Sequence, residues 1–413
     1  MIHIEKLSSE STRMYNWENF CDFLIPGQTN KFQSSTNHNK WIETKFITSE
    51  YFSNSVFKKF PNVLIGKHFG TIGMDLDLLL LGHINIDNLV VEMSAECLKA
   101  MPRKKLKLLL ETYPVILNDF MEFGTLYGMD QPHLVTFLNN LNIKPKQLFL
   151  VGGGFQLHDY PQLNIFKIQF EFWTVVTVLL DEFFSNAVFN SKYKEQQLAK
   201  LENTPTKFCL APIYKPRYKR VELLALLDNL NILEKCDWSL ALNSSPRVDS
   251  YAENAIEDFS PFIQKYQFPR ELTSTEKYNT LQKPQTDWFN RYKFYVSAET
   301  YIGDEMDMIM GGCSSITEKT IKSFLIGASP IILGGTGSLD HLDKMGFKTQ
   351  FGNYDTTSTS DISKLLLEIN DNPIYDAKLI QHNFNRITDL EFLIELFCQP
   401  ISQISTILNN NQR

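Results

Sequence analysis

The sequence predicts an α/β protein of two domains, each built around a parallel sheet. The first indication is size: 413 residues, 43% of them hydrophobic, supply enough apolar side chains for about two or three domain cores. The second is segment 133–155, where an apolar helical period, a turn at Lys144–Pro145 and a strand ending in three glycines follow one another. The third is segment 291–346, which alternates strand, helix, strand and helix.

The other apolar segments agree with this class. In the first half, runs at 61–69 and 76–93 indicate strands, and 104–113 indicates a helix that ends before a proline. In the second half, 207–214 indicates a strand, and leucines recur at helical spacing over 221–236. Strands and helices therefore alternate in both halves of the chain.

A change of composition indicates the boundary between the domains. Residues 190–207 are polar, show no clear apolar period and contain a proline near their end. We expect an N-terminal domain at 1–205, a C-terminal domain at 206–385 and a helical segment at 386–413. Prolines and polar residues at 245–290 predict a loop-rich insertion or a region of short helices.

Charge and cysteine content restrict the class of protein. The net charge of -7 does not attract polyanions over the whole surface, although the short basic stretches 101–108 and 214–221 leave room for a local nucleic-acid groove. Six separated cysteines without a CxxC pair indicate reduced thiols. The start lacks the apolar run of a signal peptide, and the apolar segment 170–184 is too short to span a bilayer. We expect a cytoplasmic protein without a membrane span.

Polar residues gather where ligands bind in parallel α/β sheets, at the carboxyl ends of strands and the starts of the following helices. Three clusters occupy such positions in the C-terminal half: Ser297, Glu299 and Thr300; Thr317, Glu318 and Lys319; and Gly334, Gly335, Gly337 and Ser338. A carboxylate such as Glu318 can accept from both hydroxyls of a ribose, and Lys319 offers a charge for phosphate. A helix start and a glycine turn add backbone N–H groups that favour an anion. Together these groups suit a nucleoside diphosphate.

Each cluster also has an ordinary structural interpretation. Thr317 followed by Glu318 is a common helix start, with a threonine cap and a glutamate in the first turn. Lys319 and Lys322 are typical of a solvated helix face. The turn GGTGS does not match the dinucleotide fingerprint GxGxxG, which argues against a nicotinamide enzyme.

The order of residues carries more information than their spacing. Segment 294–349 contains a Ser-x-Glu-Thr strand end, Thr-Glu-Lys-Thr-x-Lys, an apolar strand, a Gly-Ser-Leu turn and a Gly-Phe. It resembles a family of phage and bacterial glycosyltransferases, and it is distantly similar to the donor domain of the fucosyltransferases. The resemblance implies the GT-B architecture, two Rossmann-like domains facing each other across a cleft, with the donor in the C-terminal domain. It also implies a last helix that crosses back to the N-terminal domain. Segment 389–410 could form this helix, because its apolar residues have roughly helical spacing up to a break expected at Pro400.

The resemblance also suggests residue roles. A fainter match at 207–233 would place Arg220, perhaps with Arg217, at the donor diphosphate, although the family has His-Arg where this chain has Lys219-Arg220. The implied donor-binding residues are Arg220, Glu299, Thr317, Glu318, Lys319, Gly335, Gly337 and Ser338. The implied activity is transfer from a nucleotide-sugar co-substrate to an acceptor hydroxyl, with no separate cofactor.

An inverting transfer also needs a base that takes the proton of the acceptor hydroxyl. Candidates in the N-terminal domain are His68, Asp75, Asp77, Glu92 and Glu96, of which Asp75 and His68 are preferred. A structural hydrogen-bonding role for His68 stays open. The Asp75-Leu76-Asp77 sequence matches a metal-binding Asp-x-Asp only weakly, so no metal is expected.

Two acceptor classes remain open, a glycan and the hydroxymethyl group of a modified base in phage DNA, which would have to be reached within the duplex. The alternative to an enzyme is a protein that binds a nucleotide sugar or carbohydrate without transferring it. Dispensable carboxylates in the N-terminal domain would favour this alternative.

Overall fold

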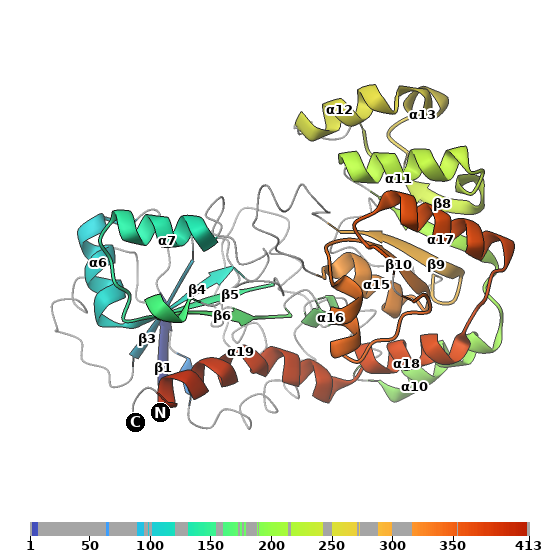
Figure 1. Ribbon diagram of the computed structural model, residues 1–413. Helices are drawn as coiled ribbons and strands as arrows, with labels where there is room; N and C mark the ends of the chain where they lie inside the picture. Colours follow the sequence, from blue (N-terminus) through green and yellow to red (C-terminus); the bar gives the residue numbers. More distant parts are fainter. Residues whose placement is uncertain are drawn as a thin grey trace. The chain divides into compact units, whose positions relative to one another are not determined.

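The structure is a computed structural model of the 413-residue chain (Figure 1). The residues that it describes are 2–6, 63–65, 89–94, 98, 101–119, 131–153, 160–171, 174–175, 177–178, 188, 190–213, 216–242, 250–270, 272, 288–299, 316–352 and 354–410. These residues divide into two compact units. The first lies within Met1–Val175 and Leu390–Arg413, and the second within Val176–Met306 and Ser314–Asp389.

The first unit contains a six-stranded sheet in the order β2-β1-β3-β4-β5-β6, and every paired strand in it is parallel. Its strands are β1 (Ile2–Lys6), β2 (Val63–Ile65), β3 (Leu89–Ser94), β4 (Pro114–Asp119), β5 (Gln147–Gly152) and β6 (Ile165–Gln169). The helical elements of this unit are α6 (Arg103–Thr112), α7 (Gln131–Asn140), the 3-10 turn η2 (Pro161–Leu163) and α19 (Leu390–Asn410).

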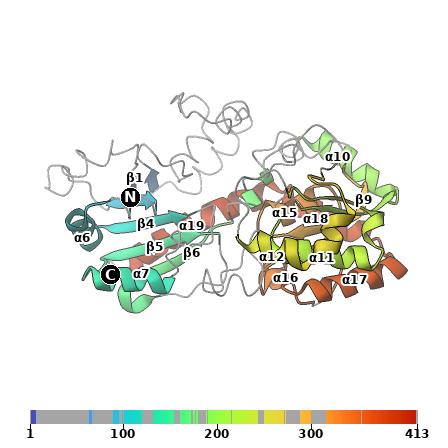
Figure 2. The ribbon, with the colours of Figure 1, turned by 90° about the horizontal axis from the view of Figure 1, so that it is seen from above.

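Helices cover both faces of this sheet (Figures 1 and 2). On one face, leucines of α6 and α7 such as Leu109 and Leu138 pack against strand residues such as Val115 and Leu148. On the other face lies α19, which contacts β6. Because both faces are covered, β5 is buried along its whole length, as parallel strands usually are.

Helix α19 belongs to the first unit although it follows the last helix of the second. Phe397 in this helix meets Phe170 after β6, with ring centroids 6.3 Å apart. The helix runs without interruption through Pro400, so the predicted break at this residue is wrong. Pro400, Ile401 and Ile404 are all buried, and this packing offsets the backbone hydrogen bond that a proline removes.

The second unit contains a four-stranded sheet in the order β10-β9-β7-β8, also with parallel pairing throughout. Its strands are β7 (Lys207–Pro212), β8 (Cys236–Ser239), β9 (Tyr292–Ala298) and β10 (Ser329–Leu333). Its helical elements are α10 (Ser191–Ala199), η3 (Lys200–Glu202), α11 (Tyr218–Asn229), η4 (Leu233–Lys235), α12 (Ser250–Asp258), α13 (Ser260–Lys265), α15 (Glu318–Leu325), α16 (Ser338–Lys344), α17 (Thr359–Asp371) and α18 (Ala377–Ile387).

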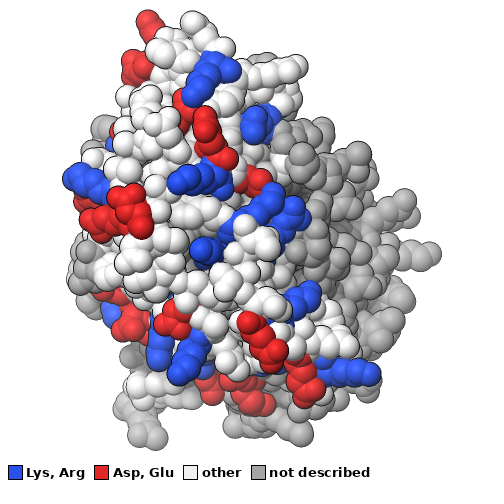
Figure 3. Space-filling view, turned by 90° about the vertical axis from the view of Figure 1, so that its right-hand side faces the viewer, with Lys and Arg blue, Asp and Glu red and all other residues white. Residues whose placement is uncertain are grey.

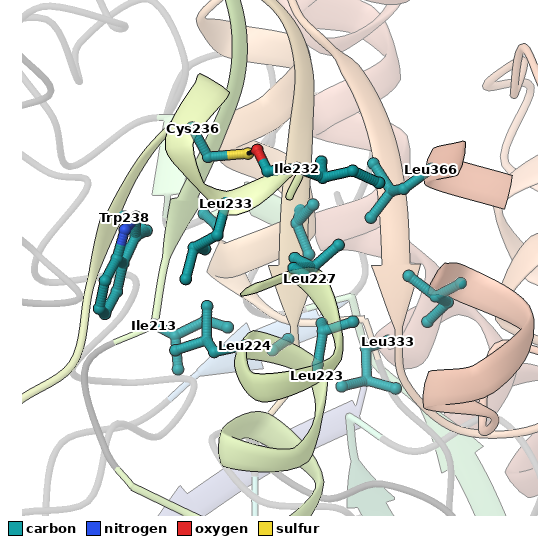
Figure 4. Packing of buried hydrophobic residues seen from close by; sticks show 14 of the residues in the cluster. Ile213, Leu223, Leu224, Leu227, Ile232, Leu233, Cys236, Trp238, Leu333 and Leu366 are labelled. Atoms are coloured by element: carbon teal, nitrogen blue, oxygen red, sulfur yellow. Dashed lines mark hydrogen bonds between the residues drawn. The ribbon is translucent and has the colours of Figure 1, made fainter. Parts of the chain in front are cut away.

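Two groups of helices cover this second sheet. Leucines of α11 pack with β10 and α17, as Leu223, Leu227, Leu333 and Leu366 show in Figure 4. On the other face, α15 contacts β9, β10 and α18, and its Phe324 stacks on Phe347 with centroids 4.4 Å apart. The predicted α/β class with parallel sheets is therefore confirmed.

The division between the units differs from the expected boundary at 205. Helix α10 and the turn η3, in the polar segment that suggested the boundary, belong to the second unit. Leu198 and Leu201 pack there with Phe289 and Phe384. Only a few apolar residues make this contact. The segment therefore shows no apolar period in the sequence, although it packs against the rest of the second unit. None of the helices in the described part of the chain is long and apolar enough to cross a membrane.

Candidate functional site

The candidate site lies at the carboxyl edge of the second sheet, where β9 ends and α15 begins. Side chains alternate between the two faces along β9. Phe294, Val296 and Ala298 join the core under α11, so Ser297 and Glu299 project to the opposite side, toward α15. This alternation brings two polar residues of one strand end to the start of one helix.

Glu299 joins the end of β9 to the first turn of α15. Its Oε1 accepts hydrogen bonds from the backbone N–H of Thr317 at 3.2 Å and from the Thr320 hydroxyl at 2.6 Å, and its Oε2 accepts from the Thr317 hydroxyl. The Thr320 hydroxyl also lies 2.9 Å from that of Ser297. Burial raises the pKa of the Glu299 carboxyl above its ordinary value, although Lys319 and the two threonines oppose this rise. The carboxylate thus fixes the position of the helix start.

Arg220 approaches the same strand end from the first turn of α11. It is only 3% exposed, and its Nη2 donates to the backbone carbonyl of Ala298 at 3.0 Å and to that of Glu299. Hydrogen bonds from a charged donor are roughly twice as strong as neutral ones. Arg220 therefore holds α11 to the end of β9 and places a positive charge beside Glu299.

Two lysines surround a second buried carboxylate, Glu318, at the start of α15. Glu318 is 1% exposed, and its Oε1 lies 2.7 Å from Nζ of Lys319, which also donates to the Thr317 hydroxyl at 3.3 Å. Burial alone would raise the pKa of Glu318, but Lys319 and Lys322 outweigh burial and lower it. Glu318 is consequently ionised at neutral pH, and Lys322 is nearly as buried, at 4% exposed.

The glycine turn between β10 and α16 lies against this cluster. A Cβ on Gly334 would stand 3.3 Å from Cγ of Glu299 and 3.3 Å from Oγ of Ser338, so the turn approaches Glu299 closely. The carbonyl of Gly335 accepts from the hydroxyls of Ser338 and Thr356, each at 2.7 Å. Gly337 caps α16 in the left-handed conformation, with φ of 79°, which glycine adopts without strain.

The cluster gathers charges of both signs at this edge of the sheet. Arg220, Lys319 and Lys322 bring three positive charges to this edge of the sheet, against two carboxylates, Glu299 and Glu318. The N-terminus of α15 adds positive partial charge from its backbone N–H groups. Cationic side chains and a helix N-terminus therefore meet at this edge, and both favour an anionic ligand.

The structure brings together all eight predicted donor-binding residues of the C-terminal half, Arg220, Glu299, Thr317, Glu318, Lys319, Gly335, Gly337 and Ser338. The predicted bases His68 and Asp75, with Asp77, Glu96 and Thr300, lie outside the described residues, as does the side chain of Glu92.

Three further residues of the cluster were not named among the predicted donor-binding residues, although Thr320 and Lys322 belong to the Thr-Glu-Lys-Thr-x-Lys motif. Thr320 and Thr356 support Glu299 and Gly335, and Lys322 is buried although its sequence pattern favours a solvated face. The signal for Thr320 was the spacing of three from Thr317, which places both on one side of a helix. Thr356 lies beyond β10 and α16, and no local pattern links it to Gly335.

Comparisons with known proteins add no family. No protein-family model matches the chain, and a search of curated proteins found no match. Within the described ranges, no group of three or more His, Cys, Asp or Glu side chains is arranged to hold a metal ion.

Proposed function

We propose that this chain is a nucleotide-sugar-dependent glycosyltransferase whose donor site is the cluster at the carboxyl edge of β10-β9-β7-β8. The observation that supports the proposal is the pairing of buried Glu318 with Lys319 and Lys322 at the start of α15, beside Arg220. Cationic side chains beside the N-terminus of a helix favour an anionic ligand. A diphosphate supplies the opposite charge, and a ribose supplies hydroxyls for a carboxylate.

In this proposal each group has a defined task. Lys319 is the most accessible member, with 22% of its side chain exposed against 2% for Glu318, so it meets the diphosphate. The first turn of α15 and the turn at Gly335 offer backbone N–H groups to the same phosphates. Glu318, ionised through its lysine neighbours, accepts from the ribose hydroxyls. Arg220 and Glu299 act mainly by fixing α11, β9 and α15 around the ligand.

Transfer requires charge to be stabilised on the leaving diphosphate and a proton to leave the acceptor hydroxyl. Lys319 and Lys322 supply the first, so the proposal needs no metal. The second belongs to the first unit, with Asp75 or His68 as base. The GT-B arrangement of two Rossmann-like domains is part of the proposal, because each unit has a parallel sheet with helices on both faces. The acceptor is DNA or a glycan.

The test is calorimetric titration of the unaltered chain with UDP-glucose, GDP-mannose, dTDP-glucose and ADP-glucose. The donor that binds most tightly is then titrated into site variants. We expect Glu318→Ala and Lys319→Ala each to weaken binding about tenfold or more, which corresponds to about 1.4 kcal/mol. The matched controls are Glu234→Ala and Lys235→Ala, an acidic and a basic neighbour in the same unit that lie at the opposite end of the strands. Unchanged affinity in both site variants would show that the site assignment is wrong.

A second measurement distinguishes an enzyme from a binding protein. It follows the release of nucleoside diphosphate from the donor in the presence of candidate acceptors. An enzyme should lose this release in Asp75→Asn or His68→Ala while retaining donor affinity. Donor binding without release under any acceptor would make the chain a nucleotide-sugar-binding protein.

A further inference from the structure

A second charged surface lies in the first unit, on helix α6. Arg103, Lys104 and Lys107 stand on this helix, and Lys144 and Lys146 follow α7 in the turn before β5. We call these five residues the basic strip. Four of them are exposed, and the side chain of Lys107 is 43% exposed. The strip is separate from the candidate donor site, which belongs to the other unit.

The five cations share one flank of the helix. Successive residues of a helix are separated by about 100°, so Arg103, Lys104 and Lys107 fall within one arc of about 100° that adjoins the buried leucines, and Lys105 falls outside this arc. The turn is fastened to that side, because the N–H of Lys146 donates to the carbonyl of Leu110 at 2.6 Å. The strip therefore extends along α6, which is about 15 Å long at 1.5 Å per residue.

Helix α6 itself and the turn 141–146 contain few acidic residues. Glu111 is the one acidic residue of α6, 3.9 Å from Nζ of Lys107, and its Oε1 accepts from the N–H of Lys144 at 3.4 Å. With Lys105, helix α6 and the turn carry six cations and the one carboxylate of Glu111, in a chain whose net charge is -7. They contrast with the face in Figure 3, where acidic and basic side chains are interspersed.

The placement of these charges does not serve the stability of α6. Cations are favourable near the C-terminus of a helix and unfavourable near its N-terminus. Helix α6 has Arg103 and Lys104 in its first turn, no acidic residue there, and no basic residue in its last turn. The arrangement is the opposite of the one that the helix dipole favours, so these cations do not stabilise α6 through the dipole.

We infer that the basic strip binds the phosphodiester backbone of nucleic acid, without regard to base sequence. Duplex DNA carries one charge per about 1.7 Å of axis, so a strip of about 15 Å faces about nine phosphates. The apolar face of α6 is buried against the sheet, with Leu106, Leu109 and Leu110 all within the core. Of the leucines of α6 only Leu108 is exposed, at 47%. One leucine does not form the apolar face with which amphipathic helices enter a membrane surface, and this favours nucleic acid over anionic lipid.

If the bound nucleic acid is also the acceptor, DNA and not a glycan receives the sugar, and this part of the inference rests on the proposed function. As a statement about binding it is independent of the donor site. The experiment therefore uses the full chain without any nucleotide sugar, and its outcome is separate from that of the donor titrations.

The test is fluorescence anisotropy of a labelled 20-bp DNA duplex between 50 and 200 mM NaCl. The strip variant is Lys104→Gln, Lys107→Gln and Lys146→Gln. The control is Lys192→Gln, Lys364→Gln and Lys378→Gln, three exposed lysines of the second unit, so that both variants change net charge equally. Thermal unfolding checks that both fold.

We expect salt-dependent binding by the unaltered chain. The strip variant should lower the slope of log K against log salt by about 2.7, since each neutralised contact contributes about 0.9, and should weaken binding at least tenfold. The control should bind within about twofold of the unaltered chain. Absence of DNA binding at 50 mM NaCl, or equal losses in strip variant and control, would overturn the inference. Strip-dependent sedimentation with phosphatidylserine vesicles but no DNA binding would overturn it in favour of a membrane surface.

Discussion

The two edges of the second sheet place charge in opposite ways, although the same strands supply both. At the carboxyl edge, Glu299 and Arg220 are 1% and 3% exposed and bind through buried hydrogen bonds. At the amino edge, Lys207 and Asp237 pair with side chains 36% and 35% exposed, and Asp237 also accepts from the Tyr292 hydroxyl at 2.6 Å. Buried charge without ligand is expensive, whereas a half-exposed pair adds little stability. Removing a buried charged group at the carboxyl edge should therefore change stability more than removing one at the amino edge.

The largest effect is expected for Arg220→Met, which keeps the length of the side chain and removes the guanidinium. The carbonyls of Ala298 and Glu299 lose their charged donor while remaining buried, so unfolding should require about 2–4 kcal/mol less. The control at the amino edge is Arg291→Met, whose guanidinium lies 5.8 Å from the Tyr292 ring and should matter by under about 1 kcal/mol. Urea denaturation measures both, and equal losses would contradict the comparison.

A smaller and more specific effect is expected at Glu299. Glu299→Ala removes the acceptor of Thr317 and Thr320, which should cost about 1–3 kcal/mol, whereas Glu299→Gln retains one oxygen and should cost less. Burial raises the pKa of Glu299, so the folded protein binds a proton at this carboxyl group more tightly than the unfolded chain does.

The sign of the pH dependence follows from that raised pKa. The stability contributed by Glu299 is fully present below its unfolded pKa, about 4.3, and is lost as the pH rises through the folded pKa. Glu299→Gln lacks this loss and should gain stability relative to the unaltered chain as pH rises from about 4. Urea denaturation from pH 4 to pH 8 measures this, and a relative loss for the glutamine variant would contradict the account.

The smallest effect is expected for Asp237→Asn at the amino edge. Burial favours the neutral form, but hydrogen bonds from Lys207 and Tyr292 outweigh it and lower the pKa of Asp237. Its contribution is therefore present above the unfolded pKa, about 3.9, and is lost as pH falls through the folded pKa. Because solvent screens this pair, we expect about 0.5 kcal/mol at pH 7, decreasing with salt. If Asp237→Asn lowered the free energy of unfolding by more than about 2 kcal/mol at every salt concentration, the two edges would not differ as described.

Local signals explain why part of this edge was predictable from the sequence. The elements β9, α15, β10 and α16 each carry an apolar period, and α15 also has the cap at Thr317, whose hydroxyl accepts from the N–H of Lys319. The predicted strand, helix, strand, helix order is confirmed. These signals depend on residues a few positions apart, which sequence patterns report directly.

The contacts between elements were not predictable in the same way. In the fold, the guanidinium of Arg220 donates to backbone carbonyls 78 and 79 residues away, and no local pattern reports a contact over that distance. The hydrogen bonds from Thr317 and Thr320 to Glu299 depend on the pairing of β9 with β10 and on α15 lying against both. Helix α19 continued through Pro400 because tertiary packing outweighed the local preference of proline.

The central claim is that an anionic donor binds at the start of α15. The most direct measurement is a crystal structure of the chain with the nucleoside diphosphate that titration identifies as the tightest ligand. We predict phosphate oxygens within hydrogen-bonding distance of Nζ of Lys319 and the first N–H groups of α15, with the ribose beside Glu318. An occupied ligand elsewhere, with these groups still bound only to one another, would contradict the claim.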